Sequence, residues 1–264
     1  MTSWTIFPSD MAHIAESTHW YTRDGDPAYE VEAKKGGKRP TTLRDARVLD
    51  LLPSVTTIIG LADKPALTNW KIDQGILAAL TLPRLENEPE SDWLKRVKQD
   101  SREQSRKAAE RGTAIHAAIQ GHFESKAPDA EYWPHVKGTA EAVKEYFGVQ
   151  NWDAEKSFGH PLGFGGKTDL SCKSEKLGIV VDFKSKEFTE DSKLDTYDEH
   201  AMQLSAYAKG LQIEDARGAI CYVSATVPGL VKIIEIEKDD LTRGWNCFCA
   251  LLDFWRYKNR FHAF

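Results

Sequence analysis

The sequence predicts an α/β domain with a mixed central β-sheet flanked by helices. Apolar residues recur at helical spacing in the first half of the chain, and short apolar runs typical of buried strands follow in the second half. A helical segment separates the first three of these runs from the last two. Strands and helices in this order are typical of α/β domains.

The composition is that of a globular protein with one sizeable core. The chain has 264 residues, of which 41% are hydrophobic, and its formal net charge is −5. No apolar stretch approaches the roughly 18 residues that a membrane span requires, and the first ten residues lack the pattern of a signal peptide. We therefore expect a cytoplasmic protein without membrane contact. It should form a single domain over 1–264, divided into a hairpin and loop region at 1–50, a helical part at 51–148, and a sheet with flanking helices at 149–264.

Charge and cysteine patterns leave several interpretations open. Basic residues gather in two segments of the chain. Basic clusters of this kind are typical of solvated faces and also of surfaces that contact a polyanion. The cysteines are irregularly spaced without paired C-x-x-C motifs, so we expect buried free thiols in a reducing compartment rather than a zinc site. The basic residues gather in two segments, Lys34, Lys35, Lys38, Arg39, Arg44 and Arg47, then Lys95, Arg96, Lys98, Arg102, Arg106, Lys107 and Arg111; the cysteines are Cys172, Cys221, Cys247 and Cys249.

The first half of the chain predicts a hairpin, a loop and several helices. Residues 19–33 mix aromatic and polar residues around a turn at Asp24–Pro27, which indicates a hairpin. The basic segment 34–48 is expected to be a loop, either in contact with a phosphate backbone or simply on the surface. An acidic linker is expected at 86–92, and the long helix after it is expected to break near Asp100. The predicted helices cover about 53–60, 69–80, 92–123 and 136–147.

The long helical stretch carries a histidine beside an apolar face. His116 borders this face, where a lone histidine is more often a hydrogen-bonded core residue than a ligand. If the helix is continuous, Arg102 projects within about 40° of His116. The apolar residues recur at intervals of four, three, four and four: Ala108, Gly112, Ile115, Ile119 and Phe123.

The second half predicts five strands and two helices. An acidic connection at 187–200 precedes a helix over 201–211. The last helix, Asp239 to Lys258, is expected to pack on the sheet, because its aromatic residues at helical spacing indicate core packing rather than base stacking. The predicted strands cover about 152–159, the two apolar runs within 165–184, 219–225 and 231–237.

Two acids and a lysine stand in the central segment, 165–184. Asp169 closes its first apolar run, and Asp182 and Lys184 follow in the second. Alternation along a strand directs Asp182 and Lys184 to the same face. The short polar gap from Lys173 to Gly178 suits a hairpin that brings Asp169 beside Asp182.

Carboxylates brought together inside a protein require a compensating charge. They repel each other, and each is costly to desolvate. A few carboxylates, with water and substrate phosphate at the remaining positions, suit Mg²⁺ or Mn²⁺. Lys184 would then orient or help deprotonate an attacking water, or stabilise negative charge in the transition state. By itself, an Asp-x-Lys tripeptide is usually an ion pair on an edge strand.

The order of the motifs resembles a known signature. GGKTD followed by VVDFK is similar to the PD-(D/E)XK nuclease superfamily, in particular its RecB-like exonuclease branch. RGTAIH, which contains His116, resembles the RGTxxH motif of that branch, and Gln203 with Tyr207 resembles its QxxxY motif. PSVTTII with the downstream Trp70 resembles the N-terminal motif of mitochondrial genome maintenance exonucleases and their phage relatives. The resemblance spans about 52–211.

This resemblance implies both a fold and a function. The fold would be a restriction-endonuclease-like core with an N-terminal helical elaboration, forming a single nuclease domain. The function would be that of a metal-dependent DNA exonuclease acting on single-stranded DNA or DNA ends in replication, repair or recombination. It would act in a bacterial or phage-infected cell, where replication or recombination proteins are candidate partners. The alternatives are a duplex- or structure-specific nuclease of phage recombination or repair, a nuclease that acts on RNA, and a DNA-binding module with a vestigial site.

The resemblance also implies roles for individual residues. The catalytic set is Asp169, Asp182, Lys184 and Glu155, and the Mg²⁺ or Mn²⁺ ligands are His116, Asp169, Asp182 and the Phe183 carbonyl. Glu155 is alternatively a solvent-facing residue paired with Lys156 or Lys167. The residues expected to contact DNA are Gln203, Tyr207, Arg102 and Arg111. Some relatives hold an iron-sulfur cluster with one early and three late cysteines, and because this chain has no early cysteine we expect no cluster.

Overall fold

A five-stranded mixed sheet forms the centre of the computed structural model, which describes residues 19–174 and 178–261. The strands lie in sequence order, β7 and β8 are parallel, and every other neighbouring pair is antiparallel. The predicted α/β class with a mixed sheet is therefore confirmed. The strands are β5 (Asp153–His160), β6 (Phe164–Lys173), β7 (Gly178–Lys186), β8 (Arg217–Ser224) and β9 (Val231–Ile236).

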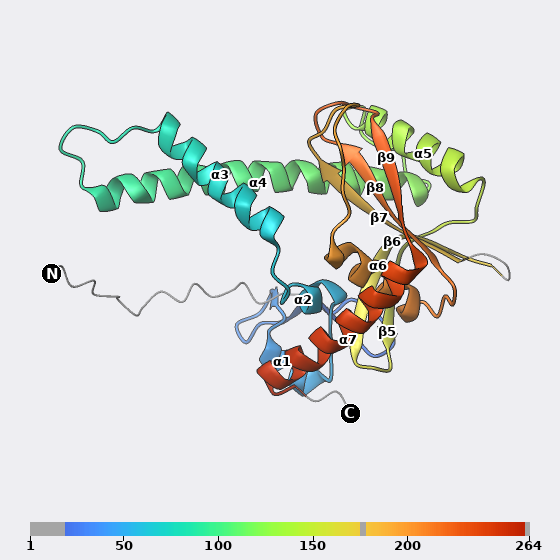
Figure 1. The fold of residues 1–264 in the computed structure, drawn as a ribbon. Coiled ribbons are helices and arrows are strands. Elements are labelled where there is room, and N and C mark those ends of the chain that lie inside the picture. The colour runs from blue at the N-terminus through green and yellow to red at the C-terminus, as the bar shows by residue number, and fades with distance from the viewer. Residues whose placement is uncertain (1–18, 175–177, 262–264) are drawn as a thin grey trace.

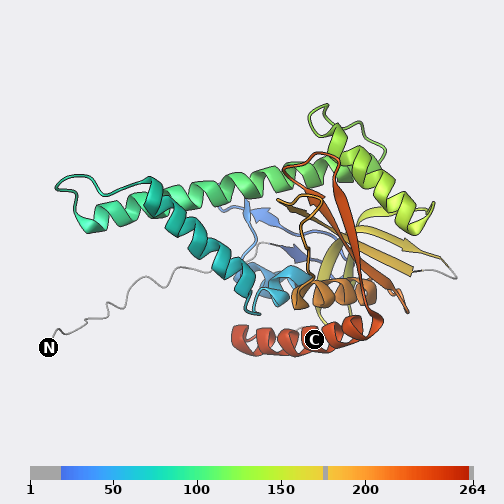
Figure 2. The same ribbon diagram turned by 45° about the horizontal axis from the view of Figure 1, so that its top comes forward.

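Helices cover both faces of this sheet (Figures 1 and 2). The α4 helix (Glu90–Phe123) and α5 (Trp133–Phe147) pack on one face, and α6 (Asp198–Gly210) packs on the other. The last helix, α7 (Lys238–Asn259), contacts Phe164 of β6 through Trp245 and Phe248, as predicted, and it also packs closely on α6. Gly244 makes this approach possible, because a Cβ there would lie 2.5 Å from the backbone of α6.

The predicted hairpin between β6 and β7 is present. Its register pairs Lys173 with Gly178, and the connecting residues 175–177 lie outside the described part of the chain. The alternation predicted for β7 is confirmed as well, since Val181 and Phe183 pack toward α4 and α5 while Asp182 lies on the opposite face. The period of two along the strand therefore fixes which face each acid reaches.

The N-terminal region differs from the prediction in its pairing. The turn at Asp24–Pro27 forms, but β1 pairs with β4 and β2 pairs with β3, so the segment does not make a single hairpin. The segment 34–48, predicted as a loop, contains the whole of β3 and most of α1. A capping box explains the helix, because Thr42 and Asp45 each accept a hydrogen bond from the other's backbone amide. The elements are β1 (Trp20–Tyr21), β2 (Glu30–Glu32), β3 (Lys38–Pro40), α1 (Leu43–Leu49), β4 (Leu52–Pro53) and α2 (Val55–Ile59).

The α3 and α4 helices form an arm that extends beyond the sheet (Figure 1). The predicted break near Asp100 is wrong, because α4 is one helix of 34 residues. No proline or glycine lies near this position, and the ion pairs of Lys95 with Asp92 and of Arg106 with Glu103 support exposed turns on either side. Within the acidic linker expected at 86–92, α4 already begins at Glu90. The α3 helix spans Pro65–Thr81.

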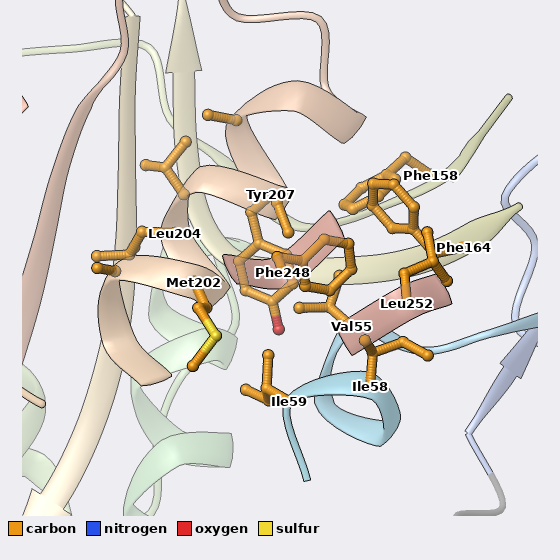
Figure 3. Packing of buried hydrophobic residues seen from close by; sticks show 14 of the residues in the cluster. Val55, Ile58, Ile59, Phe158, Phe164, Met202, Leu204, Tyr207, Phe248 and Leu252 are labelled. Atoms are coloured by element: carbon orange, nitrogen blue, oxygen red, sulfur yellow. The ribbon is translucent and has the colours of Figure 1, made fainter. Parts of the chain in front are cut away.

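The core on the α6 side joins the N-terminal region to the sheet (Figure 3). Val55, Ile58 and Ile59 of α2 are buried there, as the helical spacing of these residues predicts. They belong to the same cluster as Phe158 of β5 and Tyr207 of α6. Burial of these side chains anchors the N-terminal region against the strands that carry the acids.

Two chain features concern the membrane and the N-terminus. Within the described ranges, the structure contains no helix with both the length and the apolar character needed to cross a membrane. The first ten residues, where the sequence shows no signal peptide pattern, lie outside the described part.

Gly166→Ala should destabilise the fold by about 1–3 kcal/mol through overpacking. A Cβ at this position would lie 2.7 Å from the Phe158 ring and 3.1 Å from the Tyr207 ring. The matched control is Gly75→Ala in α3, where a Cβ meets no atom within 4 Å. This control should gain about 0.5–1 kcal/mol because alanine favours a helix interior. Urea denaturation of the two variants checks both signs, and an unchanged Gly166→Ala midpoint would contradict the packing.

Candidate metal and phosphodiester site

The candidate site lies where β6 and β7 diverge. Their ladder ends at the pair Leu170 and Val181, so the next amide along β7 has no partner on the β6 backbone. The side chain of Asp169 takes that place, and its Oδ2 accepts a hydrogen bond from the Phe183 amide at 2.7 Å. Asp169 is therefore fixed beside Asp182 by the geometry of the hairpin itself.

His116, on α4, reaches Asp169, on β6, from a helix that packs on the sheet. The α4 helix passes close to β7 at Gly112, where a Cβ would lie 3.6 Å from the Ser185 side chain. One turn later His116 Nε2 lies 3.1 Å from Asp169 Oδ2, and the imidazole packs edge-on against Phe183. Burial acts to lower the pKa of His116, but the hydrogen bond and charge of Asp169 outweigh it and raise the pKa.

Glu155 joins the site through an irregular backbone. The ladder pairs Ala154 with Leu170 and Lys156 with Thr168, which leaves Glu155 opposite Asp169 without a regular pair. Its φ of 52° lies in the left-handed region, which is uncommon for residues other than glycine. The Glu155 side chain is only 9% exposed and forms an ion pair with Lys167. The alternative of a solvent-facing residue is therefore wrong, although the predicted pairing with Lys167 is present.

Three of these groups have a spacing that fits a metal ion. Ligand atoms of His116, Glu155 and Asp169 all lie within 4.8 Å of one another, and this is the one such group among the residues that the structure describes. Two carboxylates and an imidazole, with open positions for water and phosphate, suit Mg²⁺ or Mn²⁺. The donor set present therefore fits the group that the sequence predicts.

Asp182 lies next to this group in a network of its own. Its Oδ1 accepts a hydrogen bond from Gln203 Nε2 at 2.8 Å, and its Oδ2 forms an ion pair with Lys184 Nζ at 2.7 Å. Gln203 Oε1 also accepts a hydrogen bond from Lys184 at 3.3 Å, while its amide nitrogen donates to the Tyr207 hydroxyl at 2.9 Å. Gln203, on α6, thus holds Asp182 and Lys184 in position through hydrogen bonds to both.

The electrostatics of Asp182 favour an additional cation. Burial, followed by the negative charge of Asp169, raises the pKa of Asp182 to about 6, although Lys184 acts in the opposite direction. Its Oδ2 is buried and accepts no well-aligned hydrogen bond from the described residues. For Lys184, burial acts to lower the pKa, but the charge of Asp182 outweighs it and raises the pKa. The one lysine leaves the ionised pair of acids undercompensated, and a divalent cation would offset that repulsion.

The remaining predicted residues lie around this centre. The Phe183 amide donates a hydrogen bond to Asp169. Gln203 and Tyr207 are buried behind the acids, so both contact the site from within the protein. Arg102 and Arg111 are exposed on α4, outside the group of His116, Glu155 and Asp169. The metal-binding and DNA-binding roles of these residues stay predictions.

Sequence reasoning missed several contributors to the site. Lys167 was considered only as a partner of Glu155, although its position two residues before Asp169 on a strand already places both on one face. The sequence predicts that Gln203 contacts DNA, and no local sequence pattern reveals its hydrogen bond to Asp182. Tyr21 and Tyr29, whose hydroxyls lie 2.7 Å apart, belong to a distant segment that reaches β6, where a Cβ on Gly165 would lie 2.6 Å from Tyr21.

None of the four cysteines belongs to the group of His116, Glu155 and Asp169. All four are free, Cys172 and Cys221 are buried, and Cys247 is exposed. Burial raises the pKa of the Cys221 thiol, which disfavours its thiolate. Buried free thiols were expected at all four positions, and the structure buries only the two in the sheet.

Comparisons with known proteins give only distant similarities. No family model and no curated protein matches the sequence. The crystal structure of "Putative exonuclease" from Eubacterium rectale is similar at a TM-score of 0.40 and 13% identity, over 58% of this chain and 69% of that chain. The crystal structure of SSO0001 is similar at a TM-score of 0.25 and 20% identity, over 44% of this chain and 56% of that chain. These likenesses carry no conclusion about function, which is inferred from the site itself.

Without divalent cations, Asp182→Asn should gain stability relative to the wild type as the pH rises from about 4 to about 7. The pKa of Asp182 is raised from 3.8 to about 6 in the folded state, so between these values the folded protein holds a proton that the unfolded chain has lost. The acid therefore stabilises the fold at low pH, and this contribution disappears above pH 6, a change on the order of 1–3 kcal/mol.

Urea denaturation of both proteins in EDTA, at several pH values, measures this change. Lys184 is charged throughout this range, and Asp182 interacts electrostatically with Asp169 and His116, so the change in the difference reports the ionisation of Asp182 within this group. A difference in free energy of unfolding that stays constant with pH would contradict the raised pKa. Mn²⁺ should remove the effect in the wild type, because a bound cation favours the ionised acid.

Proposed function

We propose that the protein is a metal-dependent nuclease that hydrolyses phosphodiester bonds of DNA, as an exonuclease on single strands or DNA ends. The observation that carries this proposal is the grouping of His116, Glu155 and Asp169 beside the paired Asp182 and Lys184. Candidate metal ligands next to a half-buried lysine provide both a cation site and a positive group for a phosphate. Its place in replication, repair or recombination within the cytoplasm, with partner proteins of those processes, is part of the same proposal.

Each residue of the site has a defined part in this proposal. Asp169 and Asp182 hold Mg²⁺ or Mn²⁺ together with His116, Glu155 and the Phe183 carbonyl. When bound, the cation supplies a water of lowered pKa and neutralises charge on the phosphate. Lys184, held between Asp182 and Gln203, orients the attacking water or stabilises the negative charge of the transition state. Gln203 keeps both groups in position, and Tyr207 supports Gln203.

The arm offers a surface suited to a polyanionic strand. Lys98 and His116 are eighteen residues apart, which is five turns of a continuous helix, so they project in about the same direction roughly 27 Å apart. Lys98 and Arg102 have no ion pair among the residues that the structure describes. Four basic residues fall within about 80° around the axis and line one shallow surface pocket: Lys95, Lys98, Arg102 and Arg106.

Purified protein with Mn²⁺ should degrade end-labelled DNA, and Asp182→Ala and Lys184→Ala should each lower the rate by at least about 100-fold. Lys156→Ala is the control, because Lys156 pairs with Asp153 on the surface of β5 and should leave the rate unchanged. A time course on single-stranded, duplex and flap DNA and on RNA, read by product length, identifies the substrate. Absence of degradation on every substrate, or full activity in both variants, would overturn the proposal.

Lys98→Gln combined with Arg102→Gln should weaken DNA binding without lowering the maximal rate of cleavage. Removing two phosphate contacts should raise KM several-fold and reduce the slope of log affinity against log salt by about 2. A variant matched in charge, Lys137→Gln with Lys144→Gln on α5, should leave both quantities unchanged. Fluorescence anisotropy across a salt series measures the slope, and equal effects of the two double variants would refute a specific track on α4.

A further inference from the structure

The candidate site contains a second lysine, Lys167, in addition to Lys184. Lys167 lies on β6 two residues before Asp169, so both side chains project from the same face of the strand. Lys184 pairs with Asp182, and Lys167 pairs with Glu155. The proposed function uses the first lysine and leaves the second without a part in the reaction.

The pairing of Lys167 conflicts with the role of Glu155 as a ligand. Glu155 is only 9% exposed, so it has little access to water and depends on Lys167 for a compensating charge. The same carboxylate belongs to the group whose ligand atoms lie within 4.8 Å of one another. A cation in that group and the ammonium of Lys167 therefore compete for one acid.

Lys167 is placed so that it can change partners. Its side chain is 34% exposed, which leaves its ammonium accessible from solvent while its partner is buried. A lysine side chain is a cation at neutral pH, so Lys167 carries a positive charge whichever acid or phosphate it contacts. Once the Lys167 ammonium is released from Glu155, it would attract the nearest phosphate oxygen of a substrate bound at the metal site.

We propose that Lys167 is a phosphate-binding residue that Glu155 releases when the divalent cation binds. In the metal-free protein, Lys167 compensates the buried Glu155. In the loaded protein, it contacts a phosphodiester oxygen of the substrate beside the metal site. This inference rests on the proposed function, and it adds a second lysine to the contacts with the bound strand.

The first test measures Mn²⁺ binding by isothermal titration calorimetry in the absence of DNA. Lys167→Gln should bind Mn²⁺ about 3–30-fold more tightly than the wild type, because the competing positive charge is gone. Lys156→Gln, which removes an exposed lysine from the adjacent strand, should leave the affinity unchanged. Weaker or unchanged Mn²⁺ binding by Lys167→Gln, with a circular dichroism spectrum like that of the wild type, would overturn the proposal.

The second test measures DNA binding by fluorescence anisotropy with Mn²⁺, in a Lys184→Ala background in which cleavage is slowed by at least about 100-fold. Adding Lys167→Gln should lower the affinity for a labelled oligonucleotide about 5–10-fold despite the tighter metal binding, and Lys167→Arg should restore it. Unchanged DNA affinity would overturn the inference while leaving the proposed nuclease intact. Failure of the wild type to bind Mn²⁺ would overturn both, and tighter Mn²⁺ binding without affinity for any nucleic acid would overturn the nuclease and the phosphate contact.

Discussion

The candidate site depends on one hydrogen bond, in which the Phe183 amide donates to the Asp169 carboxylate. It occurs where the β6–β7 ladder stops after Leu170 and Val181, so a side chain replaces a backbone acceptor. This substitution satisfies a buried amide and at the same time fixes a carboxylate beside Asp182. The sheet therefore places two carboxylates close together, and the other residues of the site must balance their negative charge.

The protein balances this charge with groups from separate elements. His116 of α4, Lys167 of β6 and Lys184 of β7 each contact a different carboxylate. Their partners are Asp169, Glu155 and Asp182, respectively. Gln203 adds a neutral bridge from α6 that hydrogen-bonds both Asp182 and Lys184. Because the partners arrive from both faces of the sheet, the site forms only when the helices on both sides are packed.

Features set by local periodicity were predictable from the sequence, whereas features set by distant pairing were not. Alternation in β7 and the short gap at 173–178 were enough to predict the hairpin and the neighbouring acids. The pairing of β1 with β4 was not predictable, because such short strands are selected by tertiary packing. The left-handed backbone of Glu155 was missed for a similar reason, since this residue type gives no signal for a positive φ.

The continuity of α4 connects the arm to the site. A helix broken near Asp100 would leave the orientation of Lys98 independent of His116, because a kink changes the direction of every side chain beyond it. In the unbroken helix, five whole turns separate the two residues, so the basic surface of the arm is fixed in direction relative to the acids. The exposed ion pairs that sustain α4 across this region, such as Lys95 with Asp92, therefore matter through geometry more than through their small individual energies.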